Sequence, residues 1–258
     1  QFAARVGSNY VSMTVICLML LLSIGITACA VGMNNTLDSI TGAQAPYDFY
    51  LAATALDPET GEETAVDVPA ALKEAGFDPE AELAQCAQVA LWQGVVTWVT
   101  GDQEEVVVFL LPLSGYNGMR SLSGREPIAL AGDSCTWVIG EENDVADRLA
   151  QDGQVFRVNG HDLAVDGTAV SHEALSLGYD PTPRSYLIVP DAVLEGAAEE
   201  GALNMNIDYF CGNYRAGVPK EETEERLRSA LEDFTRIALR ADEGGGGWIR
   251  WNTRLEVY

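Results

Sequence analysis

The sequence has few basic residues and almost no histidine. Lys and Arg number 15 against 39 Asp and Glu, which gives a formal net charge of −24 at pH 7. A surface of this sign repels nucleic-acid phosphates, so the composition argues against a nucleic-acid partner. The only histidines, His161 and His172, stand in no spacing that makes a metal pair or a nucleophile and its base.

Motifs of the common enzyme classes are also absent. There is no G-x-S-x-G elbow, Walker loop, H-E-x-x-H or dinucleotide fingerprint, and the glycines at 244–247 lack the Lys and the Ser or Thr of a phosphate cradle. Acidic pairs abound, but so many acids produce pairs by chance, and an acid hydrolase therefore has no specific support. We expect no catalytic residue, no cofactor and no ATP hydrolysis in this chain.

Cysteine is scarce and scattered. The five residues contain no C-x-x-C spacing, which excludes a structural zinc site of the usual kind. Cys17 and Cys29 lie in an apolar run, so at most one disulfide can form among Cys86, Cys135 and Cys211. Strand-like residues surround these three, and a cysteine in such company is more often a small core residue than half of a bridge. We do not predict a disulfide.

Residues 11–33 form an uninterrupted apolar run without a charged side chain. At about 1.5 Å of rise per residue, a helix of this length crosses a hydrocarbon core of about 30 Å. Arg5 is the only charged residue before position 34, and basic residues mark the cytoplasmic side. We therefore expect residues 1–10 to be a cytoplasmic flank, residues 11–33 a transmembrane helix in the lipid bilayer of the cell membrane, and residues 34–258 an extracellular domain.

The extracellular domain is predicted to be α+β, with mostly antiparallel strands and short helices, and it is long enough for two subdomains. The sequence starts with Gln1, and we expect a piece of a longer polypeptide. Alternation and β-branched content predict strands at 47–51, 89–100, 106–111, 135–139, 185–189, 206–214 and 248–258. Capping residues predict helices at 67–76, from 78, at 114–124 with Ser114 as the cap, from 143 or 144 to 150, from 190 through 194, and from Pro219 at N1.

Three local features give more specific expectations. Asn159-Gly160 predicts a two-residue hairpin turn that pairs 158 with 161, so that Phe156 and Leu163 point inward and Arg157 faces Asp162. The strands 89–100 and 106–111 form an antiparallel pair that we expect to be buried on both faces. The acidic stretch 57–63 is predicted to be an exposed loop, since its spacing does not match an EF-hand calcium loop.

The order of these pieces resembles the FtsX-like permease family, the membrane subunits of one class of ABC transporter. The run SNYVSMTVICLMLLLSIGITACAVGMNN is similar to the family's helix before an extracellular insertion, and YDFYLA to the strand that follows. The remaining similar segments are LPLSGYNGMRSLSGREPIAL, VNGHDLAV, SYLIVPDAVL and NYRAGVPKEETEERLRSAL.

This resemblance implies that a separate ATP-binding cassette ATPase subunit hydrolyses the nucleotide. The permease would couple that motion to its extracellular domain, for export, antimicrobial-peptide resistance or sensing, or control of an envelope partner. A peptide or an envelope protein is then the expected ligand of the domain. No ligand-binding residue is carried over, so the ligand-binding residues stay unknown at this point.

A second hypothesis rests on Ile26-Thr27-Ala28-Cys29, which resembles the lipobox of bacterial lipoproteins. Arg5 and the apolar segment would then be a secretory signal, and Cys29 would be lipidated. The protein would be a membrane-anchored extracellular binding module without a spanning helix. Against this, apolar residues continue past Cys29 through Met33.

Overall fold

The computed structural model describes residues 13–33, 45, 47–101, 103–140, 144–172, 175–178, 184–241 and 244–253. The chain divides into two compact units, Gln1–Ala43 and Gln44–Tyr258. In the first unit, Met13–Met33 is a helix that is long and apolar enough to cross a membrane by length and composition. Positions 11 and 12 of the predicted span lie outside the described residues.

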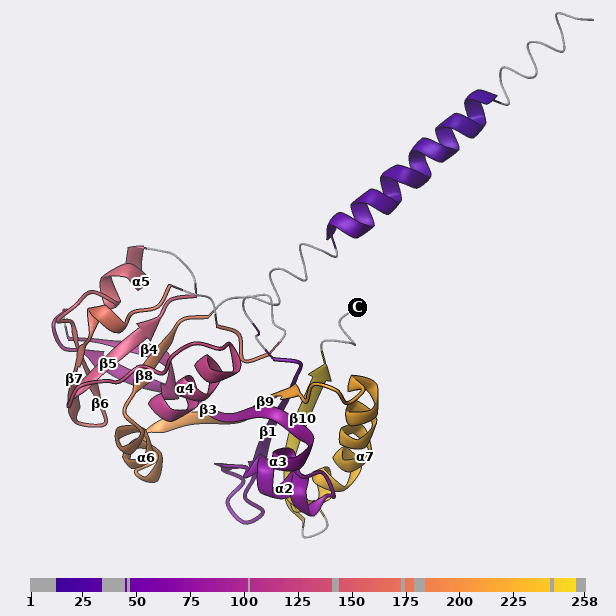
Figure 1. Ribbon diagram of the computed structural model, residues 1–258. Coiled ribbons are helices and arrows are strands. Elements are labelled where there is room, and N and C mark those ends of the chain that lie inside the picture. Colours follow the sequence, from indigo (N-terminus) through magenta and orange to yellow (C-terminus); the bar gives the residue numbers. More distant parts are fainter. Residues whose placement is uncertain are drawn as a thin grey trace, which may run out of the picture. The chain divides into compact units, whose positions relative to one another are not determined.

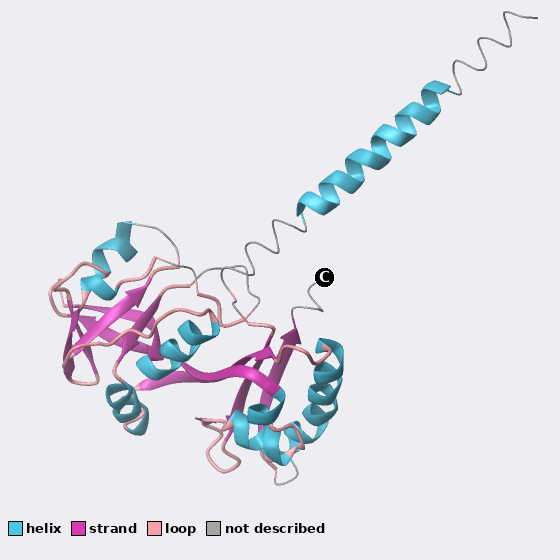
Figure 2. Ribbon diagram, viewed as in Figure 1, coloured by secondary structure: helices cyan, strands magenta, loops and turns pink. Residues whose placement is uncertain are grey.

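The second unit is a mixed helix and strand domain, as predicted (Figures 1 and 2). Its strands are β1 (Phe49–Leu56), β2 (Glu63–Thr64), β3 (Leu83–Trp98), β4 (Glu104–Pro112), β5 (Ser134–Val138), β6 (Val155–Val158), β7 (His161–Val165), β8 (Tyr186–Val189), β9 (Leu203–Tyr214) and β10 (Gly246–Thr253). Its helices are α2 (Val68–Glu74), α3 (Pro79–Glu82), α4 (Leu113–Leu122), α5 (Asp144–Leu149), η1 (Gly167–Ala169), α6 (Asp191–Glu199) and α7 (Lys220–Ala238).

All the described strands belong to one sheet, in the order β10-β1-β9-β3-β4-β8-β5-β7-β6, with β2 beside β1. The pairs β4–β8 and β5–β7 are parallel and the other strand pairs are antiparallel, so the sheet is mostly antiparallel as predicted. β6 also pairs with β3, through Thr97 with Arg157 and Trp98 with Phe156. This pairing closes β3, β4, β8, β5, β7 and β6 into a barrel, whereas β9, β1 and β10 extend from β3 as an open sheet.

Three hydrophobic clusters follow from this topology. The barrel encloses one, which includes Phe156, Leu110 and Leu187. The open sheet has a cluster on each face, because alternate residues of a strand point to opposite sides. Tyr50 and Ala52 of β1 belong to the cluster under α4, and Phe49 and Leu51 to the cluster under α2 and α7. Figure 1 shows α2, α3 and α7 together at the end of the domain that carries β1 and β10.

The predicted hairpin is confirmed in its register. Val158 pairs with His161 and Phe156 with Leu163, and Asn159 and Gly160 have the positive φ angles, 48° and 80°, that the turn requires. Phe156 and Leu163 are fully buried, whereas Arg157 donates to Asp162 across the strands at 2.6 Å.

Several predicted details are wrong. β3 and β4 are not buried on both faces, since Val95 is 46% and Val107 63% exposed at the outside of the barrel. Ser114 does not cap α4. The helix starts at Leu113 after Pro112, whose fixed φ of −67° suits the position before a helix although no side chain caps it. Pro219 occupies the N-cap of α7 and not N1.

The ends of some strands and helices also differ from the predicted ones. β1 runs to Leu56, beyond the predicted 51, because Ala52, Ala53 and Ala55 are buried on it and still pair with β10. The predicted cap of α5 at Asn143 and the strand end at 254–258 lie outside the described residues. The acidic stretch 57–63 is a largely exposed loop, as predicted.

The described cysteines are all free. Cys135 and Cys211 are buried and Cys86 is exposed. Burial raises the pKa of the Cys135 thiol to about 12 and that of Cys211 still further above its usual range. Since the thiolate is the reactive form, both core thiols are unreactive in the folded domain.

We predict that a maleimide at pH 8 labels Cys86 of the folded, detergent-solubilised chain and leaves Cys135 and Cys211 unlabelled. The latter two react only in urea, when unfolding exposes them and returns their pKa values to the normal range. Peptide mass analysis after timed labelling measures this. Labelling of Cys211 as fast as Cys86 without denaturant would contradict the buried position of β9.

Candidate functional site

The first and last described strands of the domain meet at one place. Phe49, at the start of β1, pairs with Thr253 at the end of β10 and with Gly212 near the end of β9. The backbone N–H of Asp48 donates to the Gly212 carbonyl at 2.9 Å. We call this place, defined by Asp48, Tyr214 and Thr253, the strand-end junction. The chain thus enters and leaves the sheet at neighbouring positions.

One carboxylate ties three elements together at the junction. Oδ2 of Asp48 accepts a hydrogen bond from the Tyr214 backbone N–H at 2.9 Å, and Oδ1 lies 2.6 Å from Nζ of Lys220. The Lys220 ammonium also lies 5.9 Å from the centre of the Tyr214 ring. The Asp48 side chain is only 14% exposed, which strengthens the pair relative to one in open water. Asp48 thereby connects β1 to β9 and to the first turn of α7.

A second carboxylate connects α7 to the last strand. Oε1 of Glu224 accepts from the Thr253 hydroxyl at 3.3 Å and from Nη2 of Arg228 at 3.4 Å, and its side chain is 9% exposed. The Arg228 guanidinium lies 5.3 Å from the centre of the Trp251 ring. Successive turns of α7 therefore hold the start of β1 and the end of β10.

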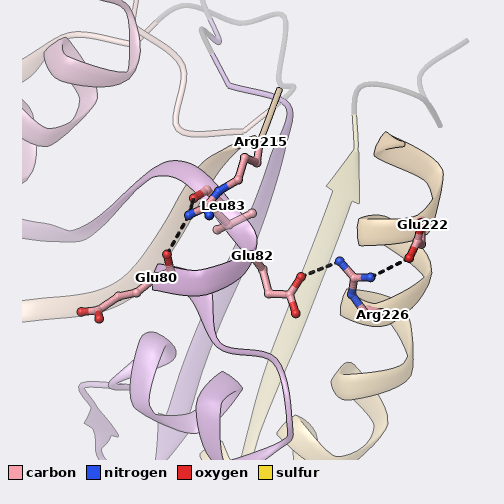
Figure 3. A network of polar contacts seen from close by, with 6 residues as sticks. All are labelled: Glu80, Glu82, Leu83, Arg215, Glu222 and Arg226. Carbon is pink, nitrogen blue, oxygen red and sulfur yellow. Dashed lines mark hydrogen bonds and ion pairs between the residues drawn. The ribbon is translucent and has the colours of Figure 1, made fainter. Parts of the chain in front are cut away.

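A polar network extends this attachment to α3 (Figure 3). Arg226 of α7 donates to Glu222 at 3.0 Å and to Glu82 of α3 at 2.5 Å. Arg215, in the connection from β9 to α7, donates to the carbonyls of Glu80 and Leu83, both at 3.1 Å. A single exposed ion pair contributes little, but a network that joins three segments fixes their relative position.

The junction consists of strand pairing, ion pairs and packing. Among its described residues, no side chain couples a nucleophile to a base. It joins the start of β1 and the end of β10 to α7.

The residues singled out in the sequence do not gather at this site. His161 is exposed on β7, and His172 is exposed directly after the Ser171 bridge to Val138. In the part of the chain that the structure describes, no group of three His, Cys, Asp or Glu residues could hold a metal ion. In the acidic loop, the Asp57 carboxylate accepts the N–H groups of Thr60 and Glu59, which lowers the pKa of Asp57 and closes an ordinary turn.

Sequence patterns missed the junction because its contacts join distant positions. Asp48 and Lys220 are 172 positions apart, and nothing in their local sequence indicates the pair. The local sequence does show acids in the first turn of α7, Glu221 and Glu222, but these are also explained by the favourable interaction of acids with the helix dipole.

No protein-family model matches the sequence and no curated protein matches it. Five chains of solved structures are similar to this chain, and two of them are the following. The periplasmic region of MacB from Actinobacillus actinomycetemcomitans is 9% identical, with 84% of this chain and 93% of that chain covered and a TM-score of 0.46. A domain of a protein from Porphyromonas gingivalis that is described as a permease is 15% identical, with 81% and 91% covered and a TM-score of 0.41. These similarities assign no activity, ligand or partner to this chain.

Proposed function

We propose that this chain is part of an FtsX-like permease subunit of an ABC transporter, in which the domain of residues 44–258 is an extracellular insertion between membrane segments. The observation that carries the proposal is the pairing of Phe49 with Thr253. Neighbouring strand ends suit a domain that is inserted between two spans, because both connections to the membrane then start from one place.

The attachment of both strand ends to α7 supports a coupling role. In the proposal, a separate ATP-binding cassette ATPase subunit hydrolyses ATP and moves the membrane segments, while this chain hydrolyses nothing itself. Motion that reaches Asp48 or Thr253 passes to α7 through Lys220 and Glu224. The domain would use it for export, antimicrobial-peptide resistance or sensing, or control of an envelope partner.

The structure of the apolar helix supports a retained span over the lipoprotein alternative. The helix Met13–Met33 continues for four residues past Cys29. A lipoprotein would instead be cleaved before Cys29 and acylated there. In the permease, Cys29 is an ordinary residue of the helix, and residues 34–258 lie outside the cell membrane.

Intact-mass analysis of the full-length protein extracted from membranes tests this choice. We expect an uncleaved chain with an unmodified Cys29, and we expect the Cys29→Ala variant to stay in the membrane fraction. Cleavage before Cys29 with added acyl mass on the wild-type chain would overturn the permease in favour of the lipoprotein.

A further inference from the structure

An apolar groove lies between α6, β3 and the start of α4. Its volume is about 390 Å³. This falls within the range of about 300–1,000 Å³ that is typical of small-molecule sites. Its apolar lining residues are Ala65, Ala90, Trp92, Pro112, Leu194 and Ala198. The groove therefore suits a ligand with an apolar body of one or two rings.

The floor of the groove belongs to the core of the barrel. Leu194 is 3% exposed and is a member of the hydrophobic cluster that the barrel encloses. Trp92 packs against the same cluster but is only half-buried, so part of its side chain faces the groove. An indole ring offers a large apolar contact area, and its face attracts cations. Trp92 therefore provides a contact for an apolar ring and for a cation next to it.

The walls of the groove are fixed without a ligand. The backbone N–H of Ser114 donates to Oδ1 of Asp191 at 3.0 Å, which ties the first turn of α4 to the first residue of α6. Leu194 and Ala197 are buried and hold α6 against the domain. A ligand would therefore bind a site that is already formed, which lowers the entropic cost of binding.

One side of the groove is acidic. Asp191, Glu195 and Glu199 line it at intervals of four residues, which places them along one side of α6. Asp191 accepts the hydrogen bond from Ser114, whereas Glu195 and Glu199 are exposed. Neither glutamate forms an ion pair in the part of the chain that the structure describes. The described lining residues include no Lys or Arg, so the groove attracts a cation and disfavours an anion.

We propose that this groove binds a small organic cation, an amine whose apolar rings contact Trp92 and whose ammonium group faces Glu195 and Glu199. The apolar lining alone would also admit neutral ring compounds, and the two carboxylates select the cation among them. An anion of the same size would bring its charge next to theirs, which costs free energy. The proposal does not depend on the permease assignment, because binding decides the first and the intact mass decides the second.

Titration calorimetry on the full-length chain in nanodiscs of zwitterionic lipid tests the site, with empty nanodiscs as the blank. The probes are naphthylethylamine, naphthylethanol and naphthylpropionate, which share one ring system and are cationic, neutral and anionic near neutral pH. We expect the amine to bind with a dissociation constant of about 1 mM or lower. The alcohol should bind at least about threefold more weakly, and the carboxylate at least about tenfold more weakly.

Variants assign the binding to this groove. The double variant Glu195→Gln/Glu199→Gln should weaken amine binding at least about threefold and leave alcohol binding unchanged. Glu221→Gln/Glu225→Gln removes the same number of exposed charges at the same spacing from α7, and its affinity for the amine should match the wild type. Ala198→Phe keeps both groove glutamates and should block the amine and the alcohol by filling the groove. Near-UV circular dichroism confirms that each variant is folded.

The proposal fails if the amine shows no saturable binding up to about 10 mM, a range that includes millimolar dissociation constants. It also fails if the alcohol or the carboxylate binds as tightly as the amine, or if the α7 double variant weakens binding as much as the groove double variant. Unchanged binding in folded Ala198→Phe would place the amine elsewhere. A helical peptide of leucine and lysine that binds the wild type but not Ala198→Phe, when the amine binds neither, would show that the occupant is a protein segment and would overturn the proposal.

Discussion

The Gly247→Ala variant should unfold with a free energy about 3 kcal/mol lower than that of the wild type. The backbone conformation of Gly247 is unfavourable for alanine, and the added methyl group has no space. Gly247 has a φ of +139°, and a Cβ atom at this position would lie 2.1 Å from the carbonyl oxygen of Thr54. Thr54 and Ala55 belong to β1, with which β10 pairs at this point. The methyl group must therefore push the two strands apart.

Gly246→Ala is the matched control at the neighbouring position of the same strand. Its added Cβ atom would meet only the Leu56 side chain, at an ordinary contact distance of 3.6 Å, and no positive φ is involved. Stability should stay unchanged or rise by up to about 1 kcal/mol, because alanine restricts the unfolded chain more than glycine does.

Urea unfolding of the full-length chain in detergent, followed by tryptophan fluorescence, measures both variants. All five tryptophans lie between Trp92 and Trp251, so the signal reports on the domain, and Trp248 and Trp251 lie on β10 itself. Equal stability of the two variants would show that β10 does not pair with β1 in the observed register. Because that pairing forms the strand-end junction, the same result would remove the main support for the proposed insertion.

The sequence predicted best those elements whose signal is local. The apolar helix Met13–Met33 needs only the composition of its own segment, and the 155–165 hairpin needs only the Asn-Gly turn and alternation on both sides. The helix that begins next to Pro219 is likewise predicted from its own segment, because proline is favoured at the start of a helix.

The features that the sequence did not predict depend on tertiary structure. Exposure of Val95 and Val107 follows from the closure of the barrel by β3 and β6, which leaves an outer face that apolar composition cannot reveal. Asp48 and Lys220 come together at the strand-end junction only because the β1–β9 pairing places Asp48 beside the start of α7, and neither residue has a motif around it. The candidate site is therefore a property of the topology.

The barrel closure itself leads to the second large effect, at Phe156. Its side chain is fully buried, with its ring centre 6.5 Å from that of Trp98 and 5.6 Å from that of Trp137. Phe156 also pairs with Trp98 where β6 meets β3. Phe156→Ala should cost about 3–5 kcal/mol, because it removes apolar contacts and leaves a cavity inside the barrel that the paired strands cannot close.

Arg157→Ala, one position further along the same strand, separates this packing effect from damage to the hairpin. Arg157 faces solvent, and its ion pair with Asp162 joins two half-exposed side chains. Such a pair contributes little, so this variant should stay close to the wild type in urea unfolding. The native fluorescence spectrum should also change in Phe156→Ala alone, because Trp98 and Trp137 contact that ring. If Arg157→Ala were as unstable as Phe156→Ala, the hairpin would be held by its surface pair and not by the core. If Phe156→Ala were silent, β6 would not close the barrel.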